Sequence, residues 1–235
     1  TELLNGLDAL KNEGGGMVKI CAEHILIHEV SMDYRPKYDL IIDRGSHILK
    51  HAVGIFMTFA FRGVYLINNP LSFHYFISNK DVGFSIAHDL GIRVPQTYSL
   101  PSHTTPFLKQ DDFAYHRLFD WEKMMQDVGW PCYIKPAGGR GAFAVQKVHN
   151  MEELWHHYNL SGSKIMTVQS YVESSPPWHV RCLCIGRKII PMKYIFGRGD
   201  QSRYIYEENF LTQEQGQEII DSTKIINRAF GYEMN

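Results

Sequence analysis

The sequence lacks the features that would place it in a membrane or in a disulfide-bonded secreted scaffold. Its longest apolar run, Val53–Phe61, is broken by Arg62 and falls far short of the ~20 residues that a membrane-spanning helix needs. Four cysteines in 235 residues are too few for a disulfide framework, and Cys182 and Cys184 lack the C-x-x-C spacing of a zinc knuckle. Nothing at the N-terminus resembles a signal peptide, so we expect a cytoplasmic protein with reduced thiols.

An excess of charge of one sign is also absent. Lys and Arg number 24 against 25 Asp and Glu, and this near-balance provides no field that would attract nucleic acid or an acidic membrane. Two histidine pairs have i,i+4 spacing, His24 with His28 and His47 with His51, but neither pair has a third ligand or an H-E-x-x-H motif. We therefore assign no metal ligand in this sequence. Apolar residues make up 44% of the chain, which excludes a disordered chain.

The order of the apolar segments predicts an α/β part followed by an α+β part. Strand patterns at Tyr38–Asp43 and Val64–Ile67 flank a helical pattern at Ser46–Phe61, and strand–helix–strand order predicts a parallel, Rossmann-like sheet. Residues 95–106 are rich in proline, serine and threonine and form the best linker candidate. Beyond them, short strand patterns outnumber helical ones, which predicts antiparallel pairing.

The segment Cys132–Val145 carries the most chemical information. Lys135 ends a strand pattern, a glycine-rich loop follows it, and a second strand pattern follows the loop. Gly139-x-Gly141-x-x-Ala144 matches a dinucleotide fingerprint, but that motif must open a helix. A P-loop sequence, G-x-x-x-x-G-K-[ST], is absent. Two interpretations stay open at this point: a hairpin that folds its N–H groups over phosphates beside Lys135, and an ordinary flexible hairpin.

The order of the other motifs favours the first interpretation. The chain contains, in order, NK at 79–80, LGIRVPQT at 90–97, PCYIKP at 131–136 before the glycine loop, VQSYV at 168–172, HVR at 179–181, and a hairpin from Gly186 to Lys193. Together they resemble the ATP-grasp superfamily, in its glutathione-synthetase-like and ribosomal-protein glutamate-ligase-like branch. The segment 38–69 is similar to an uncharacterised bacterial subgroup of that branch.

The resemblance implies a fold of three parts in the mixed α/β and α+β class. These are a Rossmann-like pre-ATP-grasp domain at 1–98, an ATP-grasp lid subdomain at 99–168 and a second ATP-grasp subdomain at 169–235. In the family, the acidic and Asn ligands of the catalytic Mg²⁺ lie on strands that would follow Asn235. We therefore expect the second subdomain to be incomplete and the Mg²⁺ ligands to lie beyond residue 235.

The resemblance also implies ATP and Mg²⁺ as cofactors, and it assigns site residues one by one. The nucleotide-binding residues would be Lys80, Lys135, Gly138, Gly139, Gly141, Ala142, Gln169, Ser170, Tyr171, Val172 and Lys193. The catalytic residues would be Arg181, Arg198 and Arg203.

The implied roles differ between these residues. The three lysines would contact phosphates as point charges, and the glycines would let their loop close over the β- and γ-phosphates. The Ser170 carbonyl and the Val172 amide would pair with the edge of adenine. Arg181 would orient the transferred phosphate or the acceptor carboxylate, while Arg198 and Arg203 would bind a substrate carboxylate.

The implied function is an ATP-dependent carboxylate–amine ligase of the peptide type, acting through an acyl phosphate. The alternative is a regulatory nucleotide-binding protein without ligase turnover, and a Rossmann-type oxidoreductase is disfavoured because the glycine loop opens no helix pattern. Expected substrates are small-molecule or peptide carboxylates and amines. We expect no nucleic-acid or membrane partner, and a homo-oligomer stays open.

Overall fold

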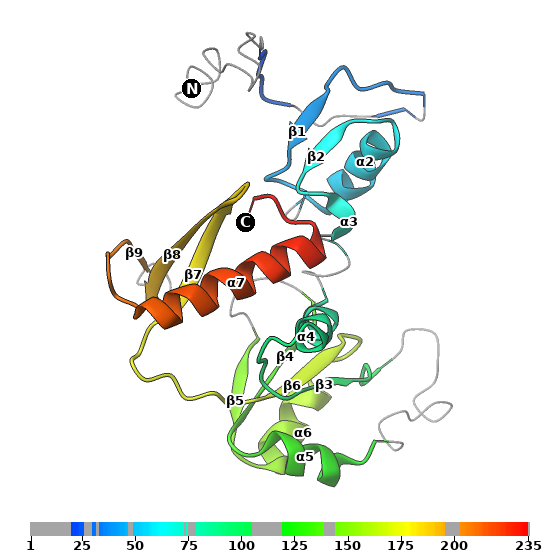
Figure 1. Cartoon of the computed structure of the whole chain (residues 1–235). Coiled ribbons are helices and arrows are strands. Elements are labelled where there is room, and N and C mark those ends of the chain that lie inside the picture. The colour runs from blue at the N-terminus through cyan, green and yellow to red at the C-terminus, as the bar shows by residue number, and fades with distance from the viewer. Residues whose placement is uncertain are drawn as a thin grey trace. The chain divides into compact units, whose positions relative to one another are not determined.

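The computed structural model describes residues 20–25, 30–31, 33–46, 49–72, 74, 79–104, 119–138, 144–195 and 203–234 (Figure 1). The chain divides into two units, residues 1–36 and 37–235, and all the helices and strands described lie in the second. Among the described residues, no helix combines the length and the apolar composition needed to cross a bilayer.

The second unit begins with a strand–helix–strand element. β1 (Leu40–Ile42) and β2 (Tyr65–Ile67) pair in parallel, and α2 (Lys50–Phe61) connects them. The central residue of each strand, Ile41 and Leu66, is buried. The predicted parallel pairing is therefore confirmed, while the Rossmann-like character of this region stays a prediction, because the described part of the sheet has two strands.

A four-stranded antiparallel sheet follows, with the strand order β3-β6-β4-β5. Its strands are β3 (Thr97–Leu100), β4 (Cys132–Pro136), β5 (Gln146–Val148) and β6 (Met166–Ser170). The predicted domain boundaries, 98/99 and 168/169, fall within β3 and β6, which pair with each other in this sheet. The boundaries stay predictions.

One face of this sheet forms the main hydrophobic core. The helices α5 (Trp121–Val128) and α6 (Met151–Asn159) pack against that face, on the opposite side from α4 (Lys80–Asp89) in Figure 1. Ile134 and Val168 are fully buried at the centre of the core. Because side chains alternate between the two faces of a strand, the neighbours of these residues project from the other face.

The last part combines a three-stranded antiparallel sheet with a long helix. The sheet has the order β7 (His179–Ile185), β8 (Lys188–Ile195), β9 (Arg203–Ile205), and α7 (Gln213–Phe230) follows it. The Thr223 hydroxyl of α7 lies 3.3 Å from the Cys182 sulfur of β7, so the helix packs on the sheet face that carries Cys182. The mixed fold class predicted from the sequence is confirmed by these elements.

Candidate nucleotide site

The sheet face opposite the main core is lined by polar side chains. Strand register places Lys147, Tyr133, Gln169 and Thr97 in one row across all four strands. A second row contains Lys135, Thr167 and Ser99. We call these seven residues the polar face. It follows from strand alternation, because the residues between them, such as Ile134 and Val168, are buried in the core.

A chain of hydrogen bonds holds Lys135 in place on the polar face. The Lys135 ammonium donates to Oε1 of Gln169 over 2.6 Å, and Nε2 of Gln169 donates to the Thr97 hydroxyl over 2.7 Å. The Thr97 hydroxyl in turn donates to the Pro95 carbonyl over 2.8 Å. Gln169 is buried, and both ends of its amide are hydrogen-bonded. Its amide is therefore held in one orientation, and it fixes the direction of the Lys135 ammonium.

The start of α4, which carries Lys80, is hydrogen-bonded to the chain just after β4, which carries Lys135. The Lys80 backbone N–H donates to the Ala137 carbonyl just after β4, over 3.0 Å. Phe84, one turn further along α4, has its ring centroid 5.2 Å from the Lys135 ammonium. The structure thus brings together two lysines that are far apart in the sequence, while their predicted contacts with phosphates stay a prediction.

Burial changes the electrostatics of both lysines. Desolvation lowers the pKa of Lys135, and the positive charge of Lys80 lowers that pKa further. Desolvation also lowers the pKa of Lys80. Among the described residues, no carboxylate lies within ion-pair distance of Lys135. A polyanion would relieve this unfavourable pairing of like charges, because it stabilises the protonated form of both amines.

The described residues include only part of the glycine-rich loop. Gly138 follows β4 and is exposed. Gly139, Gly141 and Ala142 lie outside the described residues, so the predicted closure of this loop over phosphates stays a prediction.

The residues predicted to contact adenine, Ser170–Val172, lie at the end of β6, and we call them the hinge. Ser170 is anchored twice: its N–H donates to the Gln96 carbonyl over 2.9 Å, and its hydroxyl donates to the Val128 carbonyl over 2.8 Å. Val172 is 63% exposed, and its N–H donates to no other described residue. A backbone donor without an acceptor among the described residues, next to an anchored residue, suits recognition of a base edge, but the adenine contacts stay a prediction.

The predicted residues of the three-stranded sheet do not share one face. Arg181 lies opposite Met192 and Lys193 lies opposite Val180, so the two cations project from opposite faces. The Arg181 guanidinium stacks 3.8 Å from the centroid of Tyr194 and donates to the Tyr204 hydroxyl over 3.0 Å.

Lys193 has an anionic partner. Its ammonium lies 2.6 Å from the Glu207 carboxylate and 5.0 Å from the centroid of the Trp178 ring. A phosphate contact would therefore have to displace or share Glu207. Arg203, opposite Ile195 in β9, is on the Lys193 side of the sheet, and Arg198 lies outside the described residues.

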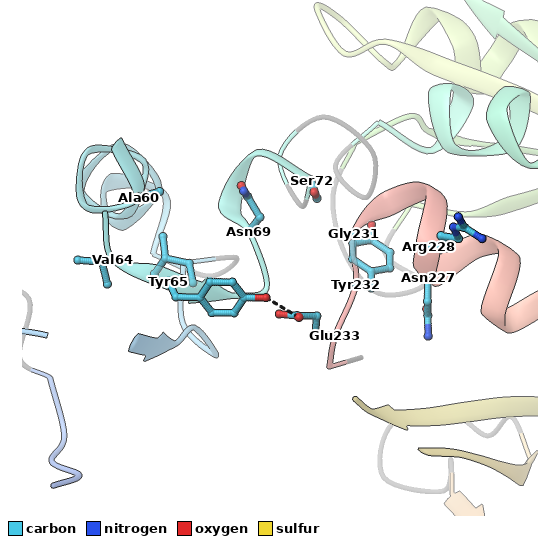
Figure 2. A pocket seen from close by; sticks show the side chains of 11 residues that line it. Ala60, Val64, Tyr65, Asn69, Ser72, Asn227, Arg228, Gly231, Tyr232 and Glu233 are labelled. Carbon is cyan, nitrogen blue, oxygen red and sulfur yellow. Dashed lines mark hydrogen bonds between the residues drawn. The ribbon is translucent and has the colours of Figure 1, made fainter. Parts of the chain in front are cut away.

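A cavity of about 570 Å³ lies apart from these residues, between β2 and the end of α7 (Figure 2). The Tyr65 hydroxyl lies 2.5 Å from the Glu233 carboxylate at its edge, and this hydrogen bond to an anion raises the pKa of Tyr65. The predicted site residues that the structure describes do not line this cavity. In the part of the chain that the structure describes, no three His, Cys, Asp or Glu residues gather as a metal site.

Comparison with solved structures identifies the fold. The chain is similar to the VanG D-Ala:D-Ser ligase of Enterococcus faecalis, with a TM-score of 0.60 and 16% identity over 82% of this chain and 56% of that one. The ATP complex of a D-alanine–D-alanine ligase from Bacillus anthracis matches with a TM-score of 0.55 and 17% identity over 75% of this chain and 54% of the ligase. A RimK domain ATP-grasp protein from Sphaerobacter thermophilus gives a TM-score of 0.55 and 15% identity, over 85% and 67% of the two chains.

These similarities establish that the chain has an ATP-grasp fold, as the sequence motifs implied. The chain spans little more than half the length of the two D-amino-acid ligases that it matches. No family model matches the chain, and no curated protein matches it by sequence.

Sequence reasoning missed several residues of the site. Tyr133 and Lys147 belong to the polar face, and Phe84 contacts Lys135 from α4. Strand alternation could have identified Tyr133, because it lies two residues before Lys135. Helical spacing could have identified Phe84, which follows Lys80 at i+4. For Lys147 the required signal was the register between β4 and β5, which the sequence pattern does not specify.

Proposed function

We propose that this chain binds ATP between Lys80 and the polar face and acts as an ATP-dependent carboxylate–amine ligase. The observation that carries the proposal is the pair of desolvated lysines, Lys80 and Lys135, with no acidic partner for Lys135 among the described residues. Two ammonium groups whose charges interact suit the β- and γ-phosphates of a nucleotide. The ATP-grasp fold supports the proposal independently, because the solved structures with this fold that match the chain include ligases.

The residues of the chain would bind and orient, and ATP would supply the phosphoryl group. A carboxylate oxygen attacks the γ-phosphorus, ADP leaves, and an acyl phosphate results. An amine then attacks the acyl carbon, phosphate leaves, and the nitrogen loses a proton to give an amide. Lys80 and Lys135 would neutralise charge on the phosphates during the first step. Gly138 and its loop, together with the hinge at Ser170–Val172, would hold the two ends of the nucleotide. No described residue is assigned to Mg²⁺.

Arg181 is the residue proposed to orient the acceptor carboxylate or the transferred phosphate. Its guanidinium stacks on the Tyr194 ring and donates to the Tyr204 hydroxyl, so its position in the sheet is fixed. We propose the same carboxylate-binding role for Arg198 and Arg203, and a phosphate contact for Lys193.

Replacement of Lys135 by alanine tests the nucleotide site. Loss of a charged hydrogen bond of about 1.5–3 kcal/mol would weaken ATP binding by roughly 10- to 150-fold, measured by calorimetry on the full chain. Lys164→Ala is the matched control, because it removes the same charge from an exposed position outside the polar face. Equal affinities of Lys135→Ala and the unmodified protein would contradict the proposed site.

A second measurement separates the ligase from a nucleotide-binding protein without turnover. ADP release would be followed with a panel of amino acids and small peptides, and the mass of each product determined. ADP release that depends on both an acid and an amine, with a product lighter than their sum by one water, supports the ligase. ATP binding without such release would favour the regulatory alternative.

A further inference from the structure

Lys147 makes a close contact with the tyrosine of the predicted hinge. Its ammonium lies 3.7 Å from the centroid of the Tyr171 ring, within the range of a cation–π interaction. Lys147 belongs to β5 and lies directly opposite Tyr133 of β4. The Tyr133 and Tyr171 rings are 5.8 Å apart. Lys147 of β5 and Tyr133 of β4 therefore restrain the Tyr171 ring, which lies directly after the end of β6.

Tyr171 lies between the two hinge residues whose backbone groups are proposed to contact the base. Tyr171 separates Ser170, which two hydrogen bonds anchor, from Val172, whose N–H has no acceptor among the described residues. The direction of the Val172 N–H relative to Ser170 depends on the backbone dihedrals of Tyr171. A fixed ring limits those dihedrals, because the side-chain rotamer and the backbone conformation are coupled.

We propose that Lys147 is a positioning residue for nucleobase binding. It holds the Tyr171 ring, so that the Val172 N–H is directed toward the base before the base binds. The proposal rests on the ATP binding proposed above and deepens it. Lys147 does not itself contact the base. Preorganisation of this kind increases affinity because less conformational freedom is lost when the ligand binds.

A competing explanation is that Lys147 adds positive charge near the phosphates. It shares the polar face with Lys135, so its charge alone could attract an anion of any kind. The two explanations predict different ligand dependence. A residue that acts through the hinge affects ligands that contain a base, whereas a residue that acts by charge affects every polyphosphate.

Calorimetry with ATP and with inorganic tripolyphosphate distinguishes the two explanations on the full chain. Lys147→Met keeps the length of the side chain and removes its charge, and it should weaken ATP binding about three- to fivefold, the effect of an exposed cation–π contact. Tripolyphosphate affinity should stay unchanged. Lys147→Arg, which retains a cation over the ring, should restore ATP affinity. Lys164→Met serves as the control for general loss of charge.

Changes at Tyr171 provide an independent readout. Tyr171→Phe keeps the ring and should bind ATP as the unmodified chain does, while Tyr171→Leu should reproduce the effect of Lys147→Met. Combining Lys147→Met with Tyr171→Leu should add no further loss, because one residue acts through the other.

Three results would overturn the proposal: ATP affinity unchanged in Lys147→Met, an equal loss for ATP and tripolyphosphate, or additive losses in the double variant. Each of these results would contradict the role of Lys147 and would leave the proposed ATP binding by the unmodified chain unaffected. Absence of ATP binding by the unmodified chain would instead contradict the proposed function, and the role of Lys147 with it.

Discussion

Lys135 shows how one residue acquires its properties from its surroundings. Its charge comes from the residue type, but its depressed pKa comes first from burial and then from Lys80. Its orientation comes from Gln169 and Phe84, which belong to other elements. A lysine at the end of a strand is ordinary in a sequence, whereas a desolvated lysine beside another lysine is a rare arrangement that suits an anionic ligand.

The depressed pKa of Lys135 predicts how ATP affinity changes with pH. In the free protein this pKa is below the ordinary value of 10.5, and a bound triphosphate raises it because the anion stabilises the ammonium. The affinity for ATP should therefore be highest near neutral pH. It should fall as the pH rises through the pKa that Lys135 has in the free protein. The fall should begin at a lower pH than for an unperturbed lysine.

Lys135→Arg provides the comparison for this pH dependence. A guanidinium stays charged to a pH above about 12, so the variant should lose only the part of the dependence that Lys135 causes. The part due to Lys80, whose pKa is also lowered, should remain. Calorimetric titrations with ATP between neutral pH and pH 10 measure both profiles, and identical profiles would show that Lys135 is not the group that titrates.

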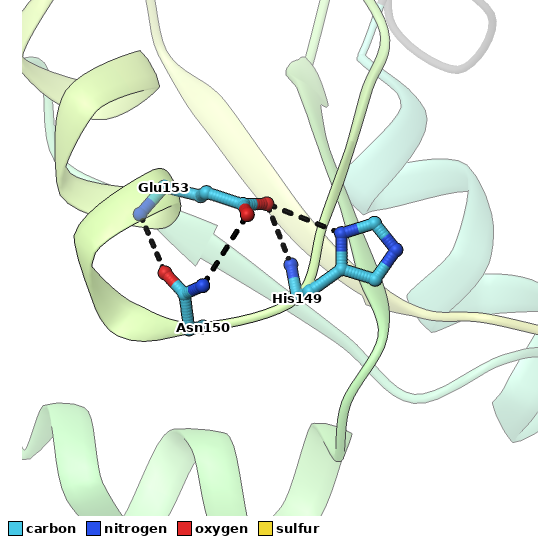
Figure 3. A network of polar contacts seen from close by, with 3 residues as sticks. All are labelled: His149, Asn150 and Glu153. Carbon is cyan, nitrogen blue, oxygen red and sulfur yellow. Dashed lines mark hydrogen bonds and ion pairs between the residues drawn. The ribbon is translucent and has the colours of Figure 1, made fainter.

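At the scale of elements, α6 shows how a helix end is built from local hydrogen bonds (Figure 3). The Asn150 side chain accepts from the Glu153 N–H over 2.9 Å, and the Glu153 carboxylate accepts from the His149 N–H over 2.9 Å. The first bond pairs an N–H that would otherwise have no partner in the first turn of the helix, and the second joins that turn to the residue before the cap.

Removal of this cap should destabilise the domain. Asn150→Ala removes the side-chain acceptor, and the loss of an N-cap residue costs about 1 kcal/mol of the free energy of unfolding. Urea denaturation followed by circular dichroism measures the change. An unchanged midpoint would mean that water replaces the cap at no cost.

The same cap predicts a dependence of stability on pH. The pKa of Glu153 is lowered, chiefly by the hydrogen bond from the His149 backbone and then by the His149 side chain. A carboxyl group whose folded-state pKa is depressed stabilises the fold above its unfolded-state pKa, and this contribution is lost as the pH falls through the folded-state value. Glu153→Gln should therefore lower the Tm at pH 7 and have a smaller effect at pH 3. Glu152→Gln, on the same turn, is the control, and an equal difference at both pH values would contradict the assignment.

At the scale of the whole molecule, Asn68 joins segments that are distant in the sequence. Its side-chain oxygen accepts from the N–H groups of Glu233 and Met234, each over 2.9 Å, and its amide donates to the Met234 carbonyl. The Glu233 carbonyl also accepts from the Gly186 N–H over 2.7 Å. The segment after α7 is thus attached both to the end of β2 and to the turn between β7 and β8.

Asn68→Ala should loosen this attachment. Two partly buried N–H groups would lose their acceptor, which costs about 1–3 kcal/mol. Hydrogen exchange at Glu233 and Met234 should accelerate, while exchange in β4 and β6 should not. Tyr65→Phe, which removes only the bond to the Glu233 carboxylate, should have the smaller effect. Undiminished protection at both amides in Asn68→Ala would show that other contacts hold the segment.

Elements whose signals are local were predictable from the sequence. Examples are the cap of α6, the capping box of α7 formed by Thr212 and Gln215, and the end of α7 at Gly231, which has a φ of 65°. These features depend on residues three or four positions apart, so the sequence contains all the information they require.

The sequence by itself determined the charge of each site residue, the alternation of polar and apolar residues in the strands, and the helix ends, because each depends on near neighbours along the chain. The order β3-β6-β4-β5 was decided only by the tertiary structure. That order places Lys147 opposite Tyr133 and Thr97 beside Gln169, and the β7–β8 register separates Arg181 from Lys193. Strand pairing and burial depend on contacts between distant segments, and the same contacts lower the pKa of Lys80 and Lys135 by desolvation.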